Sequence, residues 1–220
     1  MNTSPLFDFL QELQSNNSKE FFDANRKRYE ALREEWFQTI ELILNEMKEF
    51  DPEVAEVLPK NCMFRINRDI RFSKDKSPYK TNFSIVINPD GKKSPKPSYY
   101  FHLDYNKTLF SAGGVWMPEK AVLDQVREFI AGNPEAVKEL LENKEFKKLY
   151  GGFDKEETLK TLPKGYYDDV PYPELIKLKS YTASYNINSI PKDSKEFVKE
   201  VVSSFKALSP LIFILRKAIS

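Results

Sequence analysis

Apolar residues near the start of the chain recur every three or four positions, which is the spacing of an amphipathic helix. A short helix is predicted first, and the polar run Asn16-Asn17-Ser18 ends it. A long helix is predicted from residue 19 to about 50, and Asp51-Pro52 should end it because the residue before a proline disfavours helical backbone angles. The apolar positions that support the two helices are Leu6, Phe9, Leu10 and Leu13, and then Phe22, Tyr29, Trp36, Ile40, Ile43, Leu44 and Met47.

In the middle of the chain, apolar and polar residues alternate, which is typical of strands with one buried face. The alternating or aromatic-rich stretches span residues 62–72, 83–87, 98–104 and 108–112. Because the connections between them are short, consecutive strands are expected to pair antiparallel.

The helical period returns after residue 115. Pro118-Glu119 and Asn133-Pro134 are predicted helix starts, and a closing helix is expected from residue 194 to about 219, kinked or split at Pro210. One more strand is expected near residues 181–185. The sequence therefore predicts an α+β fold: an antiparallel meander sheet of about four to five strands packed with a long N-terminal helix and C-terminal helices.

A chain of 220 residues is expected to form one domain over residues 1–220. Within it we expect an N-terminal helical part (1–59), a strand-rich part (60–115) and a C-terminal helical part (116–220).

The composition excludes several classes of protein. With 40% hydrophobic and 30% charged residues the chain is not a disordered polymer, and a net charge of +1 excludes a bulk polycation. The single cysteine and single histidine exclude an internal disulfide and a Cys/His zinc site. No cofactor and no metal are expected. No apolar run approaches about 18 residues, and the first residues do not resemble a signal peptide, so a reducing, cytoplasmic setting without a membrane is expected.

Charge is distributed unevenly along the chain. Residues 1–59 hold 6 basic and 13 acidic side chains, whereas residues 60–97 hold 10 basic and 3 acidic ones. A concentrated basic segment in an otherwise acidic-to-neutral chain is the first place to look for function.

If residues 62–72 form a strand, Arg65, Asn67, Asp69 and Arg71 line one face at steps of roughly 7 Å, while Arg68 shares the apolar face. One interpretation is an anion site in which arginine and lysine bind phosphate or carboxylate and Asp69 orients the guanidinium groups. The other is an internal ion-pair network. Six basic and two acidic residues in the segment 65–80 leave four positive charges without a local partner. The candidate ligand-binding residues are Arg65, Arg68, Asp69, Arg71, Lys74, Lys76, Tyr79, Lys80, Gly113 and Gly114.

The segment Arg65-x-x-Arg68-Asp69-x-Arg71-Phe72-Ser73-Lys74-Asp75-Lys76-x-Pro78-Tyr79-Lys80 resembles the signature of the conserved hypothetical family called domain of unknown function 2461. The resemblance extends to Asn16-Asn17 with Phe22, Asn25 and Tyr29, to Gly113-Gly114-x-x-x-Pro118, and to Leu159-Lys160-x-x-Pro163-Lys164-Gly165-Tyr166. The chain has Asp169-Val170-Pro171 where Asp-His-Pro is expected in the family, so a histidine role at that place is not general. The family name implies membership and no activity.

Three further features are open to more than one interpretation. Gly113-Gly114 is predicted to close the strand region before a helix, either as a turn that needs positive φ or as a loop whose N–H groups hold an anion. His102 is either a structural histidine or a general base oriented by Asp104. Cys62 is expected to be a small core residue rather than a nucleophile.

The leading functional hypothesis is binding of a phosphate- or carboxylate-bearing ligand, with a nucleotide or phosphoester enzyme as the first guess should the chain be catalytic. No catalytic residue is assigned. The first alternative is a nucleic-acid-binding module, in which the loop 92–96 and the segment 65–80 form one basic face. The second alternative is a scaffold whose charged motif is an internal salt-bridge network. The partner is therefore an anionic small molecule or a nucleic acid, and the oligomeric state is left open.

Overall fold

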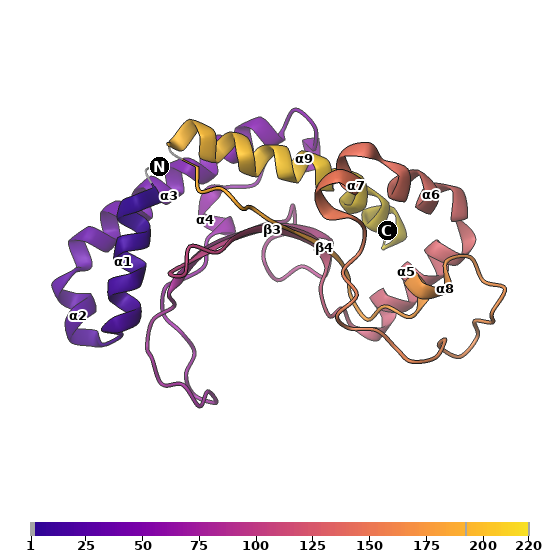
Figure 1. The fold of residues 1–220 in the computed structure, drawn as a ribbon, viewed down its shortest axis with the longest axis horizontal. Helices are drawn as coiled ribbons and strands as arrows, with labels where there is room; N and C mark the ends of the chain where they lie inside the picture. Colours follow the sequence, from indigo (N-terminus) through magenta and orange to yellow (C-terminus); the bar gives the residue numbers. More distant parts are fainter. Residues whose placement is uncertain (1–2, 192, 220) are drawn as a thin grey trace. The chain divides into compact units, whose positions relative to one another are not determined.

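The computed structural model describes residues 3–191 and 193–219, and it has the α+β fold that the sequence predicts. Its sheet has four strands in the order β1-β2-β3-β4 (Figure 1). They are β1 (Asn82–Ile87), β2 (Ser98–Asp104), β3 (Leu109–Val115) and β4 (Tyr181–Asn186). Backbone hydrogen bonds from Tyr105 to Thr81 and from Ile187 to Leu109 join opposite ends of neighbouring strands. The strands are therefore antiparallel, and the predicted meander is confirmed for β1 to β3.

The contacts of the chain divide it into two compact units. Unit 1 consists of Met1–Lys92, Tyr100–Ser111 and Asn186–Ser203, and unit 2 of Lys93–Tyr99, Ala112–Tyr185 and Ser204–Ser220. Each unit combines three separate segments, so neither is a continuous stretch of chain. The organisation as one domain over residues 1–220 stays a prediction.

Unit 1 begins with α1 (Thr3–Ser15), which packs against α3 (Arg26–Met47) (Figure 1). The prediction of one helix from residue 19 to about 50 is wrong, because Asn25 separates α2 (Lys19–Ala24) from α3. The side-chain amide of Asn25 donates to the carbonyl of Phe21 at 3.0 Å, a local bond that competes with a continuous helical ladder. A single 3₁₀ turn, η1 (Pro52–Val54), and the short helix α4 (Pro59–Cys62) lead from α3 to the basic segment.

The core of unit 1 is built around Trp36 of α3. Its ring centroid lies 5.7 Å from that of Phe83 in β1 and 5.9 Å from that of Phe197 in α9 (Ser194–Ala218). Phe101 of β2 packs against Phe197 at 5.3 Å, edge to face. Such aromatic pairs stabilise by about 0.5–1.5 kcal/mol beyond the area they bury. They hold β1 and β2 against α3, and so fix the place where the basic segment joins the sheet.

Unit 2 contains α5 (Lys120–Gly132), α6 (Pro134–Glu142), α7 (Lys144–Tyr150) and α8 (Pro173–Ile176). The predicted helix start at Asn133-Pro134 is confirmed. Arg127 of α5 is buried, and its guanidinium donates to the carbonyls of Ile176 at 2.9 Å and Leu178 at 3.0 Å. This one side chain ties α5 to the chain that leads into β4.

Pro210 does not split the closing helix, since α9 is assigned as one helix through that residue. Proline has no N–H group, so the carbonyl four residues earlier loses its helical partner. That carbonyl belongs to Lys206, and it accepts a hydrogen bond from the hydroxyl of Ser209 at 2.9 Å instead. The side chain beside the proline thus satisfies the carbonyl that the proline leaves open.

The predicted strand over residues 62–72 is wrong. Only isolated bridges form there, between Met63 and Ile85 and between Asn67 and Tyr79. The alternating apolar residues do not share a buried face, because Phe72 is 95% exposed and Phe64 is 43% exposed. Polar side chains within the segment bond its own backbone groups and so compete with a strand ladder.

The glycine pair that was expected to close the strand region lies inside β3. A Cβ on Gly113 would come within 2.5 Å of the carbonyl oxygen of Ser98, and a Cβ on Gly114 within 2.0 Å of that of Tyr181. Gly114 also has a φ of +120°. The absence of a side chain at these two positions lets the neighbouring strands approach closely.

Across residues 3–191 and 193–219, no helix has both the length and the apolar character needed to cross a lipid bilayer.

Gly114→Ala should lower the free energy of unfolding by about 2–5 kcal/mol, because a Cβ there meets backbone and the positive φ disfavours alanine. The matched control is Gly132→Ala in the same unit, where nothing lies within 4 Å of the added Cβ and alanine favours the helix. Urea unfolding of both variants measures the difference. Equal stabilities would refute the close approach at Gly114.

Candidate functional site

The basic segment forms a long irregular loop between α4 and β1 in unit 1 (Figure 1). Two backbone hydrogen bonds close its base: the amide of Arg68 donates to the carbonyl of Pro78 at 2.9 Å, and the amide of Lys80 to that of Ile66 at 2.8 Å. They flank the bridge between Asn67 and Tyr79. We call residues 65–80 the basic loop.

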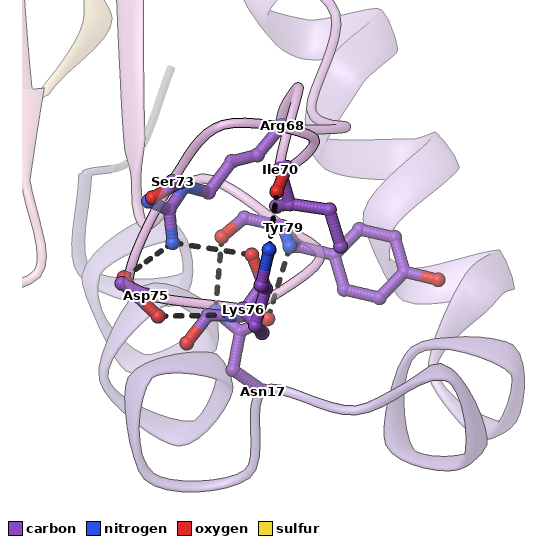
Figure 2. Close-up of polar contacts among 8 residues, drawn as sticks. Asn17, Arg68, Ile70, Ser73, Asp75, Lys76 and Tyr79 are labelled. Atoms are coloured by element: carbon purple, nitrogen blue, oxygen red, sulfur yellow. Dashed lines mark hydrogen bonds and ion pairs between the residues drawn. The ribbon is translucent and has the colours of Figure 1, made fainter.

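A single asparagine from the connection between α1 and α2 anchors this base. The side-chain amide of Asn17 donates to the carbonyl of Tyr79 at 2.9 Å, and the amide of Tyr79 donates to the side-chain oxygen of Asn17 at 3.0 Å (Figure 2). The ring of Tyr79 is buried and stacks on Phe22 of α2 at 4.1 Å between centroids. Tyr79, predicted as a ligand-binding residue, thus anchors the basic loop to the helices.

Arg68 holds the interior of the loop together. Its guanidinium reaches across the loop to the carboxylate of Asp75 and also donates to the carbonyl of Ser77 at 3.1 Å (Figure 2). The side chain and backbone of Ser77, followed by Arg68, hold the pKa of Asp75 at about 2. Asp75 is therefore ionised at neutral pH and pairs with Arg68.

The second acidic residue of the loop pairs with the next arginine. Arg71 donates to Asp69 through Nε at 2.9 Å and through a terminal nitrogen at 2.6 Å. The side chain and backbone of Arg71 lower the pKa of Asp69 below its usual value. Lys76 donates its ammonium group to the carbonyl of Ile70 at 3.0 Å (Figure 2), which braces the loop but leaves its charge without an anion.

These pairs identify which four charges of the basic loop stay uncompensated. They are those of Arg65, Lys74, Lys76 and Lys80, for which no ion pair is found in the described part of the chain. Arg65, Lys74 and Lys76 are exposed, whereas Lys80 is half-buried. Arg68 and Arg71, by contrast, already have carboxylate partners.

Arg65 and Lys80 lie at a shallow pocket beside β1. Its walls include the rings of Phe64, Trp36 and Phe83, and its other lining residues are Tyr29, Met63, Ile66, Asn82 and Ser84. The ammonium groups of Lys80 and Lys92 lie 5.2 and 5.7 Å from the centroid of the Phe64 ring. We call Arg65, Lys80 and Lys92 the cation cluster.

The members of the cation cluster repel one another. Burial lowers the pKa of Lys80, and the positive charges of Arg65 and Lys92 lower it further. Lys92 donates to the carbonyl of Met63, which fixes its ammonium group without neutralising it. A bound anion would relieve this repulsion.

A polar network adjoins the pocket at Ser84. Its hydroxyl lies 3.4 Å from Nδ1 of His102, and the hydroxyl of Tyr100 lies 3.1 Å from the same nitrogen. Nε2 of His102 is 4.0 Å from the carboxylate of Asp104, and the imidazole stacks on Phe110. Burial lowers the pKa of His102, while Asp104 opposes that shift. The neutral imidazole therefore dominates at pH 7, and Nδ1 can accept a hydrogen bond from either hydroxyl.

The remaining predicted residues lie elsewhere. Gly113 and Gly114 belong to unit 2, so anion binding by the glycine pair stays a prediction. Cys62 is buried, donates to the carbonyl of Leu58, and has its pKa raised to about 12 by burial, as expected of a core residue rather than a nucleophile. Among the described residues, no group of three or more His, Cys, Asp and Glu side chains is arranged to hold a metal ion.

Sequence reasoning missed several residues of this site. Phe64, Lys92 and Ser84 are not among the candidate ligand-binding residues, although the nucleic-acid alternative includes the loop 92–96. The signal available for Lys92 was its place in the basic segment 60–97. Nothing in the sequence indicated that it returns to Phe64, because that contact depends on how the connection after β1 folds.

A comparison with protein families matches residues 5–213 to the family described as Conserved hypothetical protein (DUF2461). The chain belongs to this family. The match includes Asn17, the basic loop, the pocket and the polar network around His102. A search of curated proteins finds no match, and neither does a search of solved structures.

Arg68→Met should make the basic loop of this DUF2461 protein open more often, because the bonds to Asp75 and Ser77 are lost. Chymotrypsin cleavage after the exposed Phe72 measures this opening, and we expect it to be several-fold faster. The melting temperature should change little, since partly exposed ion pairs contribute little to global stability. Arg33→Met, on the exposed side of α3, is the control. Equal cleavage rates would contradict the bracing role of Arg68.

Since the chain has one histidine, its imidazole proton signals report on His102 alone. We expect their NMR titration midpoint to lie below 6.5 in the folded protein because of burial. The unfolded chain then binds the proton more tightly than the folded protein does. The stability contributed by the neutral imidazole of His102 is therefore complete above about pH 6.5 and is lost as pH falls through the folded-state pKa. A midpoint above 6.5 would show that Asp104 outweighs burial.

Proposed function

We propose that this protein binds a phosphate- or carboxylate-bearing ligand at the cation cluster beside Phe64. The observation that carries the proposal is that Arg65 and Lys80 line one pocket, that Lys80 and Lys92 both lie over the ring of Phe64, and that none of the three has a carboxylate partner in the described part of the chain. Like charges that lie close together repel one another. A bound anion would replace this repulsion by attraction, and that change would favour binding.

The chemistry of the three cations suits such a ligand. Arg65 offers a planar fork that matches two oxygens of a phosphate or carboxylate, and the two lysines add point charges. Lys80 is half-buried, so its interaction with an anion is less screened by solvent than that of an exposed lysine. The exposed ring of Phe64 beside the cations offers an apolar surface against which the carbon skeleton that carries the anionic group would lie.

The proposal changes the roles of the predicted residues. Arg68, Asp69 and Arg71 become supports of the basic loop rather than ligand contacts, because each already has a partner within the loop. The internal network and the anion site, weighed above as alternatives, thus concern different residues.

We also keep a reducing, cytoplasmic setting as a proposal, supported by the single, buried and free Cys62.

Calorimetric titration at low ionic strength tests the proposal with inorganic phosphate, adenosine 5′-monophosphate and succinate as probes. We expect at least one of them to bind. Lys80→Met should weaken that binding at least tenfold, about 1.4 kcal/mol, because a charge-assisted contact is lost.

The matched control is Lys199→Met, which removes the same charge from an exposed position of α9 in the same unit. It should bind like the wild type. Failure of all three probes to bind the wild type, or equal effects of Lys80→Met and Lys199→Met, would overturn the proposal.

A further inference from the structure

The cation cluster includes two of the four uncompensated charges, and the other two, on Lys74 and Lys76, have no anionic partner in the described part of the chain. Lys74 and Lys76 flank Asp75 in the outer part of the basic loop, residues 70–76, and both are exposed. Between Arg71 and Lys74 stands Phe72, whose side chain is 95% exposed. The guanidinium carbon of Arg71 lies 5.8 Å from the centroid of its ring.

An aromatic ring so fully exposed on a braced loop gains nothing from the fold. The loop is braced by the Arg68–Asp75 pair, by the bond from Lys76 to Ile70 and by the anchor at Asn17 (Figure 2). The Arg71–Asp69 pair adds a further brace. A ring carried by a loop with a braced backbone needs less ordering when a partner stacks on it than a ring on an unbraced loop. Phe72 therefore offers an exposed aromatic ring on which a planar group can stack.

We infer that the ligand is a single-stranded nucleic acid, with a base stacked on Phe72, its backbone phosphates along Lys74 and Lys76, and a further phosphate at the cation cluster. This inference rests on the proposed function, because the cluster is one of its two contact points. Exposed aromatic rings interleaved with cations are the usual composition of surfaces that bind single strands, and base stacking contributes about 1–3 kcal/mol per base.

A duplex does not fit the same surface, because its bases are already stacked and their faces are closed to Phe72. An anionic membrane is less favoured. Membrane-bound loops need substantial apolar area or several signals together, and on the outer part of the basic loop Phe72 is the one large apolar side chain that is strongly exposed.

The chain between the two contact points limits the length of the ligand. Phe72 lies eight positions after Phe64, so the chain between them spans at most about 29 Å. A strand of about four to eight nucleotides is of the size that compact single-strand sites cover. Affinity should therefore rise with oligonucleotide length and level off near that size.

Fluorescence anisotropy with 5′-labelled oligothymidylates of 4, 8 and 12 nucleotides tests the inference on the full chain. We expect the 8-mer to bind at least tenfold more tightly than thymidine 5′-monophosphate measured by calorimetry. With three or four phosphates neutralised, the logarithm of the binding constant should fall with that of salt with a slope of about −2 to −3.

Phe72→Ala should weaken 8-mer binding about tenfold or more while leaving mononucleotide binding unchanged, because the cation cluster is intact. Leu42→Ala is the control, since Leu42 is also a strongly exposed apolar residue of unit 1 but lies on α3. It should bind like the wild type. Melting curves of both variants check that the fold is retained, which the exposure of both side chains favours.

The outcomes separate the two proposals. If the mononucleotide binds but the 8-mer binds no more tightly, or if Phe72→Ala has no effect on the 8-mer, the single-strand inference fails and the anion site stands. If neither binds, this inference fails as well, and the phosphate and succinate titrations decide the proposed function. Binding of phosphatidylserine vesicles that depends on Phe72, without binding of the 8-mer, would replace the nucleic acid by a membrane and overturn the inference.

Discussion

The site depends on one local constraint: the side chain of Asn17 pairs with both backbone groups of Tyr79, as a neighbouring strand would. The basic loop has no regular strand of its own, so its base needs partners from elsewhere in unit 1. Asn17 supplies the two hydrogen bonds, and Phe22 supplies a stacked ring for Tyr79. The backbone bond between Lys80 and Ile66 then brings the two ends of the loop together at the pocket.

The charges of the basic loop divide into two groups with different functions. Arg68 and Arg71 are neutralised by Asp75 and Asp69, and their pairs shape the loop. Arg65 and Lys80 keep their charge and meet Lys92 at Phe64. Sequence alone counts four excess charges but cannot say which they are, because the choice depends on which carboxylate each arginine reaches.

The regular elements were largely predictable from the sequence, because periodicity reports burial directly. The spans of β1, β2 and β4 and the α+β class follow from it. The segment 62–72 has the alternation of a strand, yet Phe64 and Phe72 are exposed. Between them the carboxylate of Asp69 accepts a hydrogen bond from the backbone amide of Arg71, a local bond that competes with a strand ladder. The glycine pair was placed at a turn because glycine is common there, whereas the close approach of Tyr181 comes from a strand more than sixty residues later. Long-range contacts of this kind leave no periodic signal.

Anion binding at the cation cluster is tested most directly by locating the bound anion on the protein. We record ¹⁵N–¹H correlation spectra of the labelled chain during titration with adenosine 5′-monophosphate. We expect saturable shifts of the amides of Arg65, Lys80 and Lys92, while the hydrogen bonds between Asn17 and Tyr79 stay formed. Saturable shifts concentrated in unit 2, or shifts spread evenly over all exposed lysines, would show that the cation cluster is not the site.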